Sequence, residues 1–209
     1  MQRRFLSAVG VAVATILATL AATMPASAHE PIELDSSDVL PWKGPLLLNG
    51  ESPAMLFGTL PKSSTARSAQ LHMTAGQQLI VNLAIPDQAP ENQLTTAQLP
   101  TVTIVAPNLK VTQIKPTMRV PIKIFEGTLD ALLLATYTGP AIDGDYSLIV
   151  TGGAPARFVV ATGTEDVPFG GVKRGEVATE EAVLNWYNTP PTAAASSADQ
   201  VSAQRLPAQ

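Results

Sequence analysis

Residues 66–85, ARSAQLHMTAGQQLIVNLAI, carry the clearest secondary-structure signal in this sequence. Apolar residues such as Leu71 and Met73 alternate with polar ones in the first half, and residues 79–85 repeat the alternation. A period of two places one set of side chains in a core and the other towards solvent, as in a β-strand. Gly76 supplies the positive φ that a short reversal needs. The stretch therefore predicts a hairpin of two strands joined by a tight Ala-Gly turn.

The rest of the chain repeats this alternation between turn residues. Further strands are expected at 46–48, 54–60, 101–106, 110–114, 118–125, 146–151 and 156–162, while 131–138 fits either a strand or a short helix. Pro121 cannot donate a ladder hydrogen bond, which predicts an edge or a bulge for its strand. Short, regularly spaced strands are typical of a sandwich. The sequence thus predicts an all-β, antiparallel, jelly-roll-like sandwich.

One short helix is expected after the strands, over residues 179–187. Glu180 and Glu181 lie in its first turn, where they interact favourably with the helix dipole. Pro190 and Pro191 end the helix, and the Ala/Ser/Gln-rich residues that follow predict a disordered tail.

Composition limits the class of protein. Hydrophobic residues make up 45% of the 209 residues, enough for a core, but aromatic residues make up only 5%. Without Arg3 and Arg4 of the N-terminal segment, 11 basic residues face 17 acidic ones, a net charge of −6. No basic cluster remains, which argues against nucleic acid as a partner. The absence of cysteine excludes a disulfide framework, a thiol nucleophile and a thiolate metal site.

The first 28 residues have the three parts of a secretory signal. Gln2-Arg3-Arg4 is positively charged, 6–22 is apolar and Ala-rich, and Ala26-Ser27-Ala28 is a small-x-small cleavage site. Cleavage after Ala28 would make His29 the new N-terminus and place the protein in the periplasm, the cell envelope or outside the cell. No second apolar run of membrane length follows. The expected organisation is a signal peptide (1–28), an extended arm (29–45), a sandwich domain (46–165), a loop and helix (166–188) and a tail (189–209).

Several segments resemble the bacterial pre-peptidase C-terminal domain, a secreted jelly-roll sandwich. They are Phe57-Gly58-Thr59-Leu60, the AQLHMTAGQQLIVNL strand-turn, TVTIVAPN, and the strand from Gly144 to Val150 that closes into Gly152-Gly153. The resemblance covers residues 54–162. It implies a β-sandwich with a binding or spacer role, and it carries no catalytic residues.

A copper site is one candidate for the chemistry of the mature chain. The amine and imidazole of an N-terminal His29 can chelate one metal ion together, as in a histidine brace. His72 is the only other histidine, and Met55, Met73 or Met118 offers a soft ligand. The alternative is that both histidines are ordinary surface residues.

Calcium is a second candidate, because carboxylates on loops are the ligands that it prefers. Asp143 and Asp145 flank a turn, and Asp87 and Glu91 lie in the long polar segment 86–100. The same Asp-Gly-Asp spacing is also ordinary turn chemistry. Neither a Gly-x-Ser-x-Gly elbow nor an HExxH motif is present, so nothing indicates a particular hydrolase.

The tryptophans suggest a surface for a partner. Trp42 lies in the expected arm, and Trp186 with Tyr187 in the expected helix. They either bind a partner or cover sheet edges. The leading hypothesis is a secreted, non-enzymatic binding module with an envelope protein or a polysaccharide as partner. A copper-binding protein using His29 and His72 is the alternative, and a secreted enzyme is the third.

Overall fold

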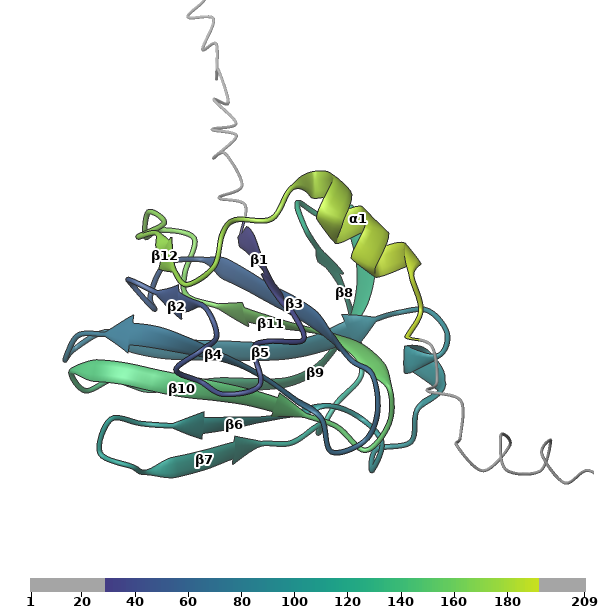
Figure 1. The fold of residues 1–209 in the computed structure, drawn as a ribbon, viewed down its shortest axis with the longest axis horizontal. Helices are drawn as coiled ribbons and strands as arrows, with labels where there is room; N and C mark the ends of the chain where they lie inside the picture. Colours follow the sequence, from purple (N-terminus) through teal and green to yellow (C-terminus); the bar gives the residue numbers. More distant parts are fainter. Residues whose placement is uncertain (1–28, 192–209) are drawn as a thin grey trace, which may run out of the picture.

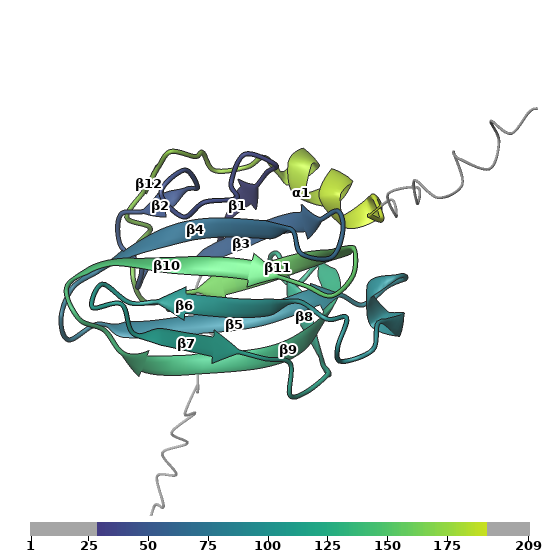
Figure 2. The same cartoon turned by 60° about the horizontal axis from the view of Figure 1, so that its bottom comes forward.

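The computed structural model describes residues 29–191 and has two β-sheets packed face to face, with one short helix against the outside of one sheet (Figures 1 and 2). The all-β sandwich predicted from the alternation is therefore confirmed. The expected signal peptide and residues 192–209 of the expected tail lie outside the described residues.

Each sheet has six strands. Sheet A has the order β1 (Glu30–Leu34), β3 (Ala54–Leu60), β11 (Ala156–Thr162), β5 (Gln78–Pro86), β9 (Leu129–Pro140) and β8 (Val120–Ile124). Sheet B has the order β12 (Val172–Lys173), β2 (Leu46–Leu47), β4 (Ala66–Met73), β10 (Gly144–Thr151), β6 (Thr101–Val105) and β7 (Val111–Ile114). A 3₁₀ helix, η1 (Glu91–Gln93), precedes β6, and α1 (Glu180–Asn188) follows β12.

The stretch 66–85 forms two strands as predicted, but they are not a hairpin. β4 belongs to sheet B and β5 to sheet A, so the turn at Gly76, with φ of 94°, carries the chain from one sheet to the other. Leu71 of β4 and Val81 of β5 are both fully buried in the core between the sheets. The alternation correctly identified the buried side of each strand. The same alternation is expected whether two strands are hydrogen-bonded neighbours in one sheet or lie in opposite sheets across the core.

Two of the strand pairs are parallel, so the sheets are mixed rather than antiparallel throughout. β1 pairs in parallel with β3, and β2 pairs in parallel with β4. Residues 30–34, expected in an arm outside the sandwich, are thus an edge strand of sheet A. Local periodicity contains no information on the direction of a partner strand, which explains the error.

The ambiguous segment 131–138 is part of a long strand, β9. Pro121 lies in β8, an edge strand that pairs only with β9, as predicted for a residue without an N–H group. The two-residue strand β12 was not predicted, because so short a segment shows no periodicity.

Helix α1 packs on the outer face of sheet A. Thr179 caps it by accepting a hydrogen bond from the backbone N–H of Ala182 at 3.2 Å. Trp186 packs on Phe57 with ring centroids 5.1 Å apart, and its Nε1–H donates to the Gly58 carbonyl at 3.0 Å. The helix therefore closes a second, smaller apolar cluster outside the main core. Its members are Met55, Phe57, Ala84, Leu129, Ala131, Val159, Val183 and Trp186.

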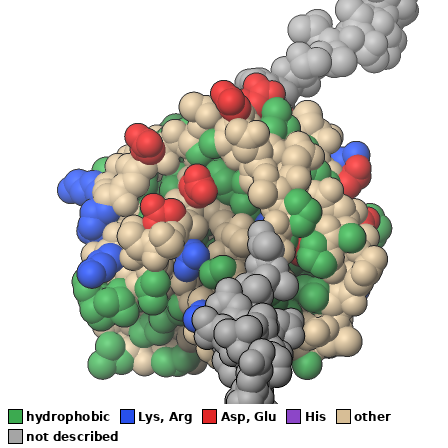
Figure 3. Space-filling model, turned by 45° about the vertical axis from the view of Figure 1, so that its right-hand side comes forward, with side chains coloured by type: hydrophobic (Ala, Val, Ile, Leu, Met, Phe, Trp, Pro, Cys, Tyr) green, Lys and Arg blue, Asp and Glu red, His purple; other side chains and the backbone are tan. Residues whose placement is uncertain are grey.

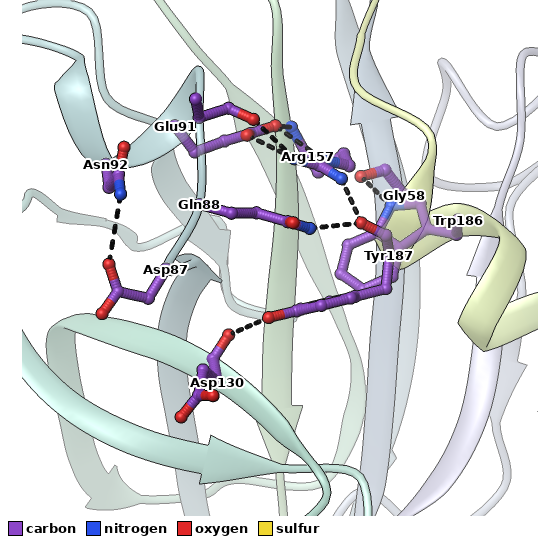
Figure 4. Close-up of polar contacts among 10 residues, drawn as sticks. Gly58, Asp87, Gln88, Glu91, Asn92, Asp130, Arg157, Trp186 and Tyr187 are labelled. Carbon is purple, nitrogen blue, oxygen red and sulfur yellow. Dashed lines mark hydrogen bonds and ion pairs between the residues drawn. The ribbon is translucent and has the colours of Figure 1, made fainter.

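A buried ion pair ties the long segment after β5 to this same face (Figure 4). Arg157 and Glu91 are both fully buried, and two guanidinium nitrogens donate to the carboxylate at 2.8 and 2.6 Å. Arg157 also donates to the carbonyl of Tyr187 at the end of α1. The long polar segment 86–100 is thus anchored through Glu91 to sheet A and α1.

Charged side chains are sparse on the surface. Figure 3 shows one face on which acidic and basic groups lie singly or in small groups among apolar and polar ones. Within residues 29–191, no helix is both long and apolar enough to span a membrane.

Candidate functional site

The outer face of sheet A contains a concavity of about 490 Å³ beside the part that α1 covers. Its walls are mainly apolar, and polar side chains are also among the residues that line it. The lining residues are His29, Met55, Asn82, Ile122, Lys123, Ile124, Phe125, Glu126, Gly127, Leu133, Val159, Ala161 and Glu165.

The floor of the concavity follows from the sequence of the central strands. β3 and β11 are apolar at almost every position rather than at alternate ones, and both have five consecutive buried residues. Such strands present apolar side chains to both faces, so they need cover on both. Met55 and Val159 point away from the main core and form the floor.

The β8–β9 hairpin forms one wall. The register between β5 and β9 shifts between Leu83 and Ala84, so that Leu134 is passed over as the extra residue of a bulge. A bulge bends a strand and increases its twist. Ile122 and Ile124 of β8 then line the concavity beside the floor.

The tip of this hairpin has an unusual backbone. Phe125, Glu126 and Gly127 have φ of 48°, 54° and 75°, three consecutive residues in the left-handed region. Thr128 stabilises the turn, since its N–H and hydroxyl both donate to the Phe125 carbonyl, at 3.1 and 2.6 Å. For a side chain such as Phe125 this conformation costs roughly 1–2 kcal/mol. Strain of this kind clusters at functional sites, and here it places an aromatic ring in the wall of a cavity.

Five polar or charged side chains are among the residues that line the concavity: His29, Asn82, Lys123, Glu126 and Glu165. Burial lowers the pKa of His29, and the nearby Glu165 carboxylate opposes this shift. The neutral imidazole can therefore accept or donate a hydrogen bond near neutral pH. Lys123 already forms an exposed ion pair with Asp130 at 2.8 Å.

The structure does not bring His29 and His72 together. His29 lines the concavity outside sheet A, whereas His72 of β4 is exposed on the outer face of sheet B and bonds Asp145 Oδ1 through Nδ1 at 2.8 Å. The whole sandwich lies between the two side chains, so they cannot bind one copper ion in this fold. Of the three methionines considered as soft ligands, Met55 lines the concavity with His29.

The four carboxylates considered for calcium each have other partners and do not form a ligand set. Asp145 pairs with His72, Asp143 accepts the backbone N–H of Ala75 at 2.6 Å, and Glu91 is buried with Arg157. Asp87 lies 3.4 Å from the side-chain amide of Asn92. Across residues 29–191, no three His, Asp or Glu side chains are grouped as metal ligands.

The two tryptophans have opposite environments. Trp186 is 7% exposed and covers sheet A, which is the structural role considered for it. Trp42 is 63% exposed in the loop between β1 and β2. The concavity itself was missed from the sequence, although the continuous apolar runs 54–57 and 158–161 contain the signal for it.

The chain matches no protein-family model and no curated protein. The geometry of the site is therefore the basis for assigning a function.

Proposed function

We propose that this protein is an exported, non-enzymatic binding module whose concavity on sheet A holds an apolar ligand or the apolar part of a larger one. The observation that carries the proposal is an open cavity of about 490 Å³ with an apolar floor and with polar groups among its lining residues. Pockets that bind small molecules have volumes of roughly 300–1,000 Å³ and the same division between apolar walls and a few polar groups.

The composition of the walls favours an aliphatic ligand over a sugar. Sugars stack on exposed aromatic rings, and Phe125 is the only aromatic residue among those that line the concavity. Branched and thioether side chains such as Ile122, Val159 and Met55 suit a flexible hydrocarbon chain. His29, Asn82 and Lys123 offer hydrogen bonds to a polar end group.

Export and the resemblance to the pre-peptidase C-terminal domain support the same proposal. A secretory signal in residues 1–28 would deliver the sandwich to the envelope or the extracellular space, and the resemblance implies a binding role. An envelope protein that presents an apolar segment is an alternative occupant of the same surface.

The test is a fluorescence titration of the processed protein with anilinonaphthalene sulfonate, followed by displacement with straight-chain alkyl carboxylates. We expect saturable binding at one site. Displacement should strengthen by about fourfold for each added methylene, as about 0.8 kcal/mol per buried CH₂ requires, until the chain fills the cavity.

Ala161→Phe fills the concavity and should abolish dye binding. The matched control is Ala75→Phe, which adds the same group to the exposed turn between β4 and β5, and Ala75 does not line the concavity. Phe125→Gly removes part of a wall while relieving the left-handed backbone. It should weaken binding with a change in unfolding free energy of less than about 1 kcal/mol, since strain relief and lost burial oppose each other. Equal binding by wild type and Ala161→Phe would refute the proposal.

A further inference from the structure

The loop between β1 and β2 presents a second surface that the proposed function does not use. Three large apolar residues within 39–42 are well exposed: Val39 at 45%, Leu40 at 38% and Trp42 at 63%. An exposed tryptophan with apolar neighbours is characteristic of the energetic centre of a protein interface.

Hydrogen bonds hold this loop in place. Ser68 of β4 donates to the carbonyl of Asp38 from its N–H at 2.6 Å and to the carbonyl of Val39 from its hydroxyl at 2.9 Å. Arg174 Nε donates to the Gly44 carbonyl at 3.1 Å. A β-carbon on Gly44 would lie 2.0 Å from the Ser68 carbonyl oxygen, so only glycine allows this close approach. The apolar residues are therefore presented by a pre-organised loop, which lowers the entropic cost of binding.

A cavity of about 630 Å³ adjoins the loop, between residues 33–45, the chain from Arg174 to Thr179 and the start of α1. Figure 1 shows this chain passing from β12 over β1 to α1, and Ala178 N–H donates to the Pro31 carbonyl at 2.7 Å. Four acidic and two basic side chains line the cavity: Glu33, Asp35, Asp38, Glu176, Lys43 and Arg174. Arg174 is already engaged with Gly44 and Gln70.

The buried carboxylate of Asp38 indicates the charge that this cavity would favour in a ligand. Asp38 is only 6% exposed, lines the cavity, and forms no ion pair with any of residues 29–191. Its Oδ2 accepts the N–H of Asp35 at 2.8 Å. Arg67 is near enough to attract it but makes no ion pair with it. Burial without a direct counter-ion raises the pKa of Asp38, and an incoming cation would compensate that carboxylate.

We infer that this surface binds a cationic segment of a partner protein, with a lysine or arginine entering the acidic cavity and apolar side chains packing on Trp42. Cation–π attraction to the exposed indole would act together with the carboxylates. The face is separate from the concavity of sheet A, so its test is independent of the proposed function.

The probe is a fluorescein-labelled peptide of alternating lysine and leucine, compared with one of alternating glutamate and leucine, by fluorescence anisotropy at low salt. We expect the processed wild-type protein to bind the lysine peptide alone, and added salt to weaken binding. Trp42→Ala and Asp38→Asn should each weaken it by about fivefold or more, as for central interface residues. The amide introduced by Asp38→Asn keeps an acceptor for the N–H of Asp35, and residue 42 is exposed, so both variants should fold.

Asp145→Asn, which removes one negative charge from the other sheet face, is the matched control and should leave binding unchanged. Ala161→Phe should also leave it unchanged. No binding of the lysine peptide would overturn the inference, as would equal weakening by Asp145→Asn, because the attraction would then be non-specific. Binding of a neutral oligosaccharide that depends on Trp42 but not on Asp38 would also overturn it, and would assign the surface to a polysaccharide.

Discussion

The two outer faces of the sandwich have opposite character. On sheet B, β10 and the second half of β4 alternate, so that Gln70, His72, Asp145 and Ser147 point outward over a buried inner row. On sheet A, β3 and β11 are apolar on both sides, and α1, the β8–β9 hairpin and segment 86–100 cover the second side. These elements do not cover the whole outer face of sheet A, and the concavity lies at the uncovered part. The comparison shows that a strand without alternation requires a second layer, and that a gap in this layer leaves the concavity that we propose as the binding site.

Two of the three ion pairs among residues 29–191 provide the sharpest contrast. Arg157 and Glu91 are fully buried under the cover of sheet A, whereas the side chains of His72 and Asp145 are 51% and 46% exposed on sheet B.

Arg157→Met should have the largest effect. It leaves the Glu91 carboxylate buried with only a backbone N–H as donor and releases the carbonyl of Tyr187 from the guanidinium. Removing one partner of a buried pair costs about 3–5 kcal/mol. The free energy of unfolding in urea should fall by this amount, while Lys123→Met, which breaks an exposed pair, should change it by less than about 1 kcal/mol. Equal losses would mean that the cover of sheet A is not held by this ion pair.

Trp186→Phe should have an intermediate effect. It removes the hydrogen bond to the Gly58 carbonyl and part of the surface packed on Phe57. The lost hydrogen bond costs about 0.5–1.5 kcal/mol, and the smaller ring also loses packing on Phe57. Chemical denaturation measures the loss. Dye binding in the concavity should weaken in parallel, because Met55 and Val159 line the concavity and belong to the apolar cluster that α1 covers. A stable protein with a fully retained concavity would show that α1 is not needed to form the site.

His72→Ala should change the free energy of unfolding by less than about 1 kcal/mol, because its partner remains in water. It should also leave copper(II) affinity of the processed protein unchanged, as measured by isothermal titration. Any copper bound through the amine and imidazole of His29 should instead be lost when one residue is added before His29. Loss of tight copper binding on His72→Ala would require a different arrangement of the two sheets from the one described.

The smallest expected effect is that of His29 on the pH dependence of the free energy of unfolding. Its pKa is lower in the folded protein than in the unfolded chain, mainly because of burial. The unfolded chain therefore takes up a proton first as the pH falls below about 6.5, and this contribution to stability decreases with falling pH. His29→Asn should make the loss of stability between about pH 7.5 and pH 5.5 shallower. An unchanged slope would show that residue 29 is solvated in the folded protein.

Much of the candidate site was beyond the reach of sequence analysis. Pairing His29 with His72 was reasonable because the chain has no other histidine, but residue type says nothing about which face of which sheet a side chain occupies. Arg157 and Glu91 are 66 residues apart in sequence, and no local pattern indicates that they form an ion pair. Asp87 and Glu91 were grouped as loop carboxylates, yet one is exposed and the other is fully buried.

The sequence by itself determined the positions of most strands, the buried side of each and the short helix near residues 180–188, because hydrophobic periodicity and the residues that start and stop a helix are local properties. Only the tertiary structure decided that β4 and β5 lie in different sheets, that β1 pairs in parallel with β3, and that His29 lines a concavity far from His72. Strand partners and burial of charges depend on contacts between distant segments, and a single sequence does not record which of those contacts form.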